Sequence, residues 1–201
     1  MTNIIEQSRE YVNGLLIPLE KHYYHQFNHA LVVCSRAIYL WKKEWLNESE
    51  LEMLAIAWLF HDTWFLIQYD TNEFAWAKIA RNFLKSMLYP EDKIETVERI
   101  IMATIPSYKE PKDILEEIIK DADLDYLGWE HFMEKADKLK QELEAIKKIK
   151  ILDPDWQHGS IKFLKEHKFY TKTQQKERWI KKKENVKNLE DILKDLEKDW
   201  V

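Results

Sequence analysis

Histidine and aspartate side chains occur in close pairs at three places in this sequence, and both residue types bind divalent metal ions. The pairs are His25 with His29, His61 with Asp62, and Asp121 with Asp123. Imidazole nitrogens and carboxylate oxygens together suit borderline or hard ions, which include Mn, Fe, Co, Ni, Zn and Mg. We expect a single divalent metal ion, provided that the fold brings the three pairs together.

The central pair stands at the end of the longest apolar run in the chain. In the segment MLAIAWLFHD, residues 53–62, eight apolar residues precede His61 and Asp62 without a break. A segment with no polar face belongs in a protein interior. Ionisable groups at its end are costly unless they are paired or bound to a metal. We therefore expect other helices to wrap this one and to bring partners for His61 and Asp62.

The spacing within each pair is compatible with one shared ion, although each pair alone has an ordinary explanation. His25 and His29 lie four residues apart, so on a helix they share one face. His61 and Asp62 would point about 100° apart, and an ion between the two directions is within reach of both. A histidine pair at this spacing more often lies on the surface or in the core without binding a metal. A lone His-Asp dipeptide is likewise more often the end of a helix than a metal site. The order and context of the three pairs together favour a metal site.

Apolar periodicity predicts helices along the whole chain, and three glycines and five prolines are too few for strands joined by tight turns. Ser49 and Glu52 form a capping-box pattern before the apolar helix, and Gly128 is expected to be a C-cap. The fold class is therefore all-α, a single helical bundle with a long C-terminal helix. The predicted helices are 3–16, 23–45, 50–62, 72–88, 90–105, one that begins at Pro111 and carries Asp123, 129–149, 153–167 and 173–199.

Nothing in the sequence divides the chain, so we expect one domain over residues 1–201. Its core is expected at about residues 20–135, and a helical extension at about 150–201.

The last helix carries a narrow apolar seam at steps of three and four, and docking against the same chain explains the seam better than the alternative, a homodimer contact. Lysines 181–183 are expected on a solvated face. The seam consists of Trp179, Val186, Leu189, Leu193, Leu196 and Trp200.

Composition excludes several functional classes. A net charge of −5 and a pI near 5.9 argue against a nucleic-acid binder, which is expected to be basic. The longest apolar run is less than half of the roughly 20 residues that a membrane span needs. Cys34 is the only cysteine, so no intramolecular disulfide forms. The first residues show no secretion-signal pattern, and we expect a cytoplasmic, soluble protein.

The three pairs, in their order and context, resemble the HD-domain superfamily of metal-dependent phosphohydrolases. The signature of that family is a first histidine, a His-Asp doublet and a distant aspartate on an all-helical scaffold. The segments that carry the resemblance are YHQFNHALVV, LFHDTWF and IKDADLDYLG, with QYDTNEFAWAKIARNFL and IIMATIPS between them. Together they cover about residues 20–135. The resemblance implies hydrolysis of a phosphate ester, expected to be a nucleotide, by a metal-activated water.

Residue by residue, the resemblance implies a ligand set and two further roles. Asp123 is preferred to Asp121 because the ligand in the family is the aspartate of Ala-Asp-Leu. His25 matches a histidine that donates a proton to the leaving group in some relatives. Glu73 matches an acidic residue suited to orient the attacking water, and Asp62 is suited to the same role. The implied metal ligands are His29, His61, Asp62 and Asp123.

The chain departs from the family pattern at several positions. Members with a second metal have extra histidines near Asn72 and in the 104–108 stretch. This sequence lacks them, which favours one tightly bound ion with a second weak or absent, and counts against the diiron oxygenases of the superfamily. Trp64 and Trp129 stand where small and polar residues are usual. We expect Trp64, Asn72 and Thr104 to line the substrate pocket. The alternative function is a degenerate module that binds metal and ligand without turnover.

Overall fold

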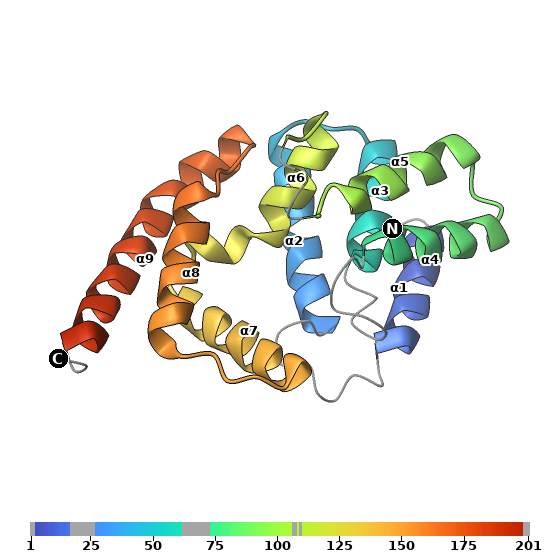
Figure 1. Cartoon of the computed structure of the whole chain (residues 1–201). Coiled ribbons are helices and arrows are strands. Elements are labelled where there is room, and N and C mark those ends of the chain that lie inside the picture. The colour runs from blue at the N-terminus through green and yellow to red at the C-terminus, as the bar shows by residue number, and fades with distance from the viewer. Residues whose placement is uncertain (1–2, 17–26, 62–72, 106–107, 109, 199–201) are drawn as a thin grey trace.

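The computed structural model describes residues 3–16, 27–61, 73–105, 108 and 110–198, and these residues form helices and no strand (Figure 1). The all-α prediction is confirmed. Over these ranges the elements are α1 (Asn3–Leu16), α2 (Phe27–Lys43), α3 (Glu48–Phe60), α4 (Glu73–Ser86), α5 (Glu91–Met102), α6 (Ile114–Asp123), the short 3-10 helix η1 (Asp125–Gly128), α7 (Phe132–Lys147), α8 (Asp153–Glu166) and α9 (Lys172–Lys198).

Helix α3 is the centre of the N-terminal part of the molecule. Every residue from Leu54 to Phe60 is buried, as expected for a helix without a polar face. Helices α1, α2, α4, α5 and α6 all contact it. The sequence prediction that other helices wrap this apolar segment is therefore confirmed. Among the described helices, none is both long and apolar enough to cross a membrane.

The N-terminus of α3 lies two residues earlier than predicted, and the proposed capping box of Ser49 and Glu52 was wrong. The Asn47 side chain accepts a hydrogen bond from the Glu50 backbone N–H at 2.9 Å, and the Glu50 carboxylate accepts from the Asn47 N–H at 2.8 Å. Asparagine is as good an N-cap as serine, and the helix begins after Asn47, the upstream of the two possible N-caps. The Glu52 carboxylate instead accepts from the Tyr89 hydroxyl at 2.7 Å.

A second apolar cluster joins the C-terminal helices to η1 and α7. Leu189 and Leu193 of α9 are buried in it, and Val186 packs against it. The predicted seam thus docks against its own chain at these three positions. Trp179 is 43% exposed, and Trp200 lies outside the described residues. The buried members of this cluster are Tyr126, Leu127, Phe132, Ala136, Ile161, Leu164, Phe169, Leu189 and Leu193.

The contact between η1 and α9 depends on Gly128. A Cβ atom at this position would lie 2.6 Å from the Arg178 Cβ and 2.9 Å from the Arg178 carbonyl oxygen. No glycine of the described residues has a positive φ. The predicted C-cap role for Gly128 is therefore wrong, and its missing side chain serves the close approach of α9.

Lys182 also departs from the prediction of a solvated lysine cluster. It is buried, and its ammonium donates to the carbonyl of His167, the residue that ends α8. Lysine at this position satisfies a carbonyl at a helix C-terminus. Burial lowers the pKa of Lys182 to about 8. Lys181, in contrast, is an ordinary surface residue that pairs with Glu184 at 3.1 Å.

Candidate metal centre

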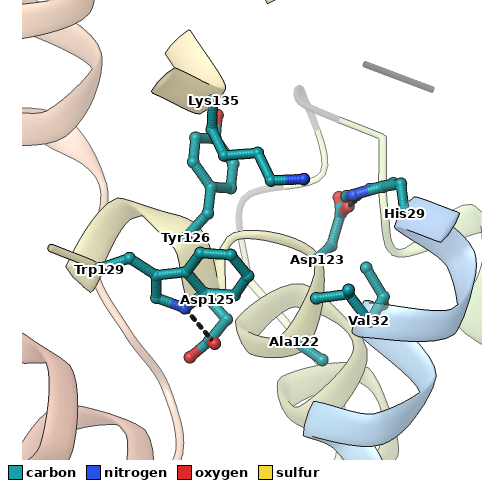
Figure 2. Close-up of a pocket in the computed structure, with 9 residues that line it drawn as sticks. His29, Val32, Ala122, Asp123, Asp125, Tyr126, Trp129 and Lys135 are labelled. Atoms are coloured by element: carbon teal, nitrogen blue, oxygen red, sulfur yellow. Dashed lines mark hydrogen bonds and ion pairs between the residues drawn. The ribbon is translucent and has the colours of Figure 1, made fainter. Parts of the chain in front are cut away.

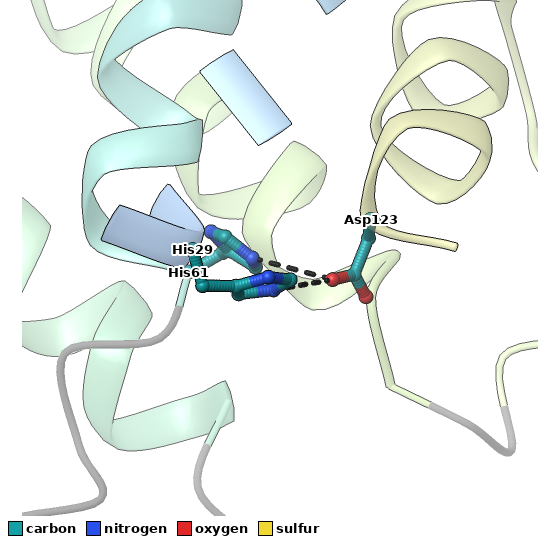
Figure 3. A group of neighbouring side chains, drawn as sticks. All are labelled: His29, His61 and Asp123. Carbon is teal, nitrogen blue, oxygen red and sulfur yellow. Dashed lines mark ion pairs between the residues drawn. The ribbon is translucent and has the colours of Figure 1, made fainter. Parts of the chain in front are cut away.

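Two histidines and one aspartate at the ends of three different helices meet at one point (Figure 3). One ligand atom from each of His29, His61 and Asp123 lies within 4.8 Å of the others. The Asp123 Oδ1 atom is 3.4 Å from the Nε2 atom of His29 and 3.5 Å from that of His61. Both histidines are buried, and the Asp123 side chain is 25% exposed. These three residues could therefore hold a metal ion.

Helix ends position all three residues. His29 lies in the first turn of α2, His61 follows the last residue of α3, and Asp123 is the last residue of α6. Helices α2, α3 and α6 contact one another pairwise. The apolar faces that pack these helices thus also bring the polar groups at their ends together, and no loop is needed to place them.

The ring of His61 is held in one orientation by its own helix. Its Nδ1 atom lies 2.6 Å from the carbonyl oxygen of Trp58. A carbonyl only accepts hydrogen bonds, so Nδ1 carries the proton and donates it. In the neutral ring, Nε2 then directs a lone pair toward the Asp123 carboxylate, and two acceptors at this distance need a cation or a proton between them. Metal-binding histidines characteristically donate their second ring N–H in this way.

Electrostatics keep Asp123 ionised. Burial by itself would raise the pKa of this carboxyl group, but when the proton between the groups is on the imidazoles, hydrogen bonds and positive charge from His29 and His61 outweigh burial and hold the pKa well below its usual range. An ionised carboxylate is the form that binds a cation. The group is thus a competent ligand at neutral pH.

The distances from the Asp123 carboxylate to the two imidazoles are compatible with a first-row divalent ion. Two ligands about 2.1 Å from one ion, at a tetrahedral angle, are about 3.4 Å apart. The observed separations of 3.4 and 3.5 Å between the carboxylate oxygen and the imidazole nitrogens match this value. Three protein ligands with one position left open are typical of catalytic zinc sites. The fourth predicted ligand, Asp62, lies outside the described residues.

Asp121, the alternative to Asp123, has a different set of partners. Its carboxylate accepts the backbone N–H groups of Tyr170 at 2.9 Å and Thr171 at 2.7 Å. The side chain is fully buried, and burial raises its pKa to about 7. Asp121 therefore anchors the segment that precedes α9, while Asp123 faces the histidines.

A hollow open to solvent adjoins the centre (Figure 2). Its volume, counted with its mouth, is about 220 Å³. His29 and Asp123 form one side of it, and aromatic and cationic side chains from η1 and α7 form the other. No motif in the sequence pointed to Lys135, which lies beyond the last matched segment. The lining residues are His29, Val32, Val33, Ala122, Asp123, Asp125, Tyr126, Trp129 and Lys135.

The other predicted site residues do not enter this geometry. Thr104 does not line the hollow, and its hydroxyl donates instead to the nearby backbone carbonyl of Ile101 at 2.8 Å. Glu73 begins α4, but its side chain lies outside what the structure describes. The remaining predicted residues, His25, Asp62, Trp64 and Asn72, also lie outside the described ranges.

Comparison with known proteins gives no family assignment. No protein-family model, curated protein or solved structure matches this chain.

Proposed function

We propose that this chain is an HD-type metal-dependent phosphohydrolase that hydrolyses a phosphate ester, with a nucleotide as the expected substrate. The observation that carries the proposal is the convergence of His29, His61 and Asp123, with His61 oriented by the Trp58 carbonyl. These residues come from the first-histidine, doublet and final-aspartate segments, in the order that the family resemblance requires.

The protein groups prepare the centre before any ligand binds. The Trp58 carbonyl fixes the tautomer and ring plane of His61, so no reorientation is needed when a cation binds. The partial exposure of Asp123 leaves the centre open to the hollow. When bound, a divalent ion supplies Lewis-acid polarisation of a phosphoryl oxygen and an acidified water.

The reaction consumes one water molecule. A new bond forms between phosphorus and the water oxygen, the bond from phosphorus to the ester oxygen breaks, and the departing oxygen takes up a proton. By the resemblance, His25 would donate that proton, and Asp62 or Glu73 would accept the proton of the water. These three roles are sequence predictions, since the side chains concerned lie outside the described part of the chain.

The test is phosphate release from a panel of nucleotides with added Mn²⁺. We expect the wild type to release phosphate from at least one of them, and Asp123→Asn to lower that rate by about 100-fold or more, because loss of a ligand impairs both binding and polarisation. Asp137→Asn is the matched control, since Asp137 is an exposed residue of α7. Turnover that survives Asp123→Asn would contradict the site. Metal binding without turnover of any substrate would favour the binding module.

A further inference from the structure

The two sides of the hollow differ in chemistry. One side holds the candidate metal ligands His29 and Asp123, and the other holds Tyr126, Trp129 and Lys135. Of the described residues that line it, Lys135 is the one lysine or arginine. The hollow is open to solvent, and its volume of about 220 Å³ includes part of that open space. The hollow therefore contacts a ligand from one side and does not enclose it.

Lys135 is placed to contact an anion at the centre. In Figure 2 its side chain extends into the hollow toward Asp123 and His29. The residue is partly buried, and burial together with the charge of Lys138 lowers its pKa. An anion bound in the hollow would favour the charged form of Lys135 and so oppose the effects of burial and of the Lys138 charge. Lysine is a common point-charge partner of phosphate groups.

Trp129 forms a rigid aromatic wall of the same hollow. Its indole N–H donates to Asp125 Oδ2 at 2.5 Å, as Figure 2 shows. Asp125 is buried and is itself held from two helices: Arg178 and Gln174 of α9 donate to it at 2.7 and 2.8 Å, and Arg36 of α2 lies 3.0 Å away. The indole is therefore fixed before a ligand arrives, which lowers the entropic cost of binding.

The cation and the indole lie close enough for one ligand to meet both. The Lys135 ammonium is 5.9 Å from the centre of the Trp129 ring. A phosphate beside the metal ligands and a planar group against the indole would satisfy both residues. Aromatic side chains bind bases by stacking without regard to sequence.

We infer that Lys135 and Trp129 determine substrate binding in this hollow, with Lys135 contacting the phosphate and Trp129 the base of a nucleoside monophosphate. This inference rests on the proposed function, because the hollow shares His29 and Asp123 with the candidate metal centre. Neither residue belongs to the histidine and aspartate set that the metal requires.

The experiment measures binding of two small probes, inorganic phosphate and adenosine, which are the products of such a reaction and are not turned over. Affinities are measured for the full chain with and without Mn²⁺. We expect Lys135→Met to weaken phosphate binding by about tenfold or more and to leave adenosine binding within about twofold. Lys138→Met is the control, because it removes the same charge from an exposed position on α7.

Trp129 is tested with two substitutions. We expect Trp129→Leu to weaken adenosine binding by about fivefold or more, whereas Trp129→Phe, which keeps an aromatic face, retains most of it. Phosphate binding should stay within about twofold in both variants. Equal losses for both probes in both Trp129 variants, or a loss of phosphate binding in Lys138→Met as large as in Lys135→Met, would overturn the assignment.

The Mn²⁺ series separates the two claims. If the metal centre were wrong, Mn²⁺ would leave every affinity unchanged, while the crossed pattern of Lys135 and Trp129 would persist. If only this inference were wrong, Mn²⁺ would strengthen phosphate binding, and substitution of Lys135 or Trp129 would not change the affinity of either probe.

Discussion

Two aspartates that stand two residues apart on α6 have opposite surroundings. Asp121 is fully buried and accepts two backbone N–H groups from residues 170 and 171, whereas Asp123 is partly exposed and faces two imidazoles. The sequence motif contains both residues and offers only the family resemblance to choose between them. The distinction depends on a segment almost fifty residues later, which periodicity does not reveal.

We predict that alanine substitutions at these two positions have separable effects. Asp121→Ala leaves two backbone N–H groups, one buried and one partly buried, without this acceptor and should lower the free energy of unfolding by about 2–4 kcal/mol. Asp123→Ala should change stability of the metal-free protein by less than half of that and should instead weaken Mn²⁺ binding. Denaturant unfolding and metal titration of both variants test this. Equal loss of stability in both would contradict the assigned roles.

His167 predicts a dependence of stability on pH. Neither of its buried ring nitrogens has a hydrogen-bond partner among the described residues, and its ring packs against Phe169 at 4.7 Å. Burial, and then the charges of Lys182 and Lys120, lower its pKa from 6.5 to about 3. Below pH 6.5 the unfolded chain therefore binds a proton that the folded chain does not. His167 therefore does not reduce the stability of the folded chain above pH 6.5. As the pH falls from 6.5 toward 3, proton binding to His167 in the unfolded chain progressively lowers the free energy of unfolding.

The measurement is the free energy of unfolding at pH 7.5 and pH 5, for wild type and His167→Phe. Between these values the wild type should lose about 2 kcal/mol more than the variant, since each unit of pKa difference corresponds to about 1.4 kcal/mol. Phenylalanine suits a site between Phe163 and Phe169. The same loss in both proteins would show that His167 is not the group responsible.

At the scale of elements, two glycines in helical segments predict opposite responses to alanine. A Cβ at Gly128 would collide with the Cβ and the backbone oxygen of Arg178, while a Cβ at Gly159 in α8 would meet nothing within 4 Å. Gly128→Ala should destabilise the protein by about 1–3 kcal/mol through overpacking. Gly159→Ala should stabilise it by about 0.5–1 kcal/mol, because alanine is the better helix former. Thermal unfolding of both variants reports the two signs, and a neutral Gly128→Ala would contradict the close approach of η1 and α9.

The elements themselves were largely predictable, and the reasons for the exceptions are physical. The apolar periodicity that predicts helices 3–16, 129–149 and 173–199 also appears in α1, α7 and α9 within three residues at each end. The α3 cap was misplaced because two overlapping sequences satisfy the same capping rule. Lys182 was misassigned because its burial depends on α8, and side-chain type alone favours exposure.

At the scale of the whole molecule, the site lies beside the junction of two apolar clusters. Helix α6 belongs to the first cluster, η1 belongs to the second, and Asp123 is the last residue of α6. Asp121 and Asp125 tie this junction to the start of α9. The order of the motifs predicted the grouping of His29, His61 and Asp123, whereas Trp129 and Lys135 share the hollow only through the packing of η1 and α7.

The most direct test of the metal centre is a calorimetric titration of chelator-treated protein with Mn²⁺. We predict one ion per chain, with affinity reduced by about tenfold or more in His61→Gln, because the Trp58-oriented ring is lost from the proposed ligand set. His158→Gln is the matched control, since His158 is an exposed histidine on α8 that pairs with Glu197. Binding of one ion that is weakened by His61→Gln and unchanged by His158→Gln would confirm the centre. Absence of binding, or binding equally strong in His61→Gln, would contradict it.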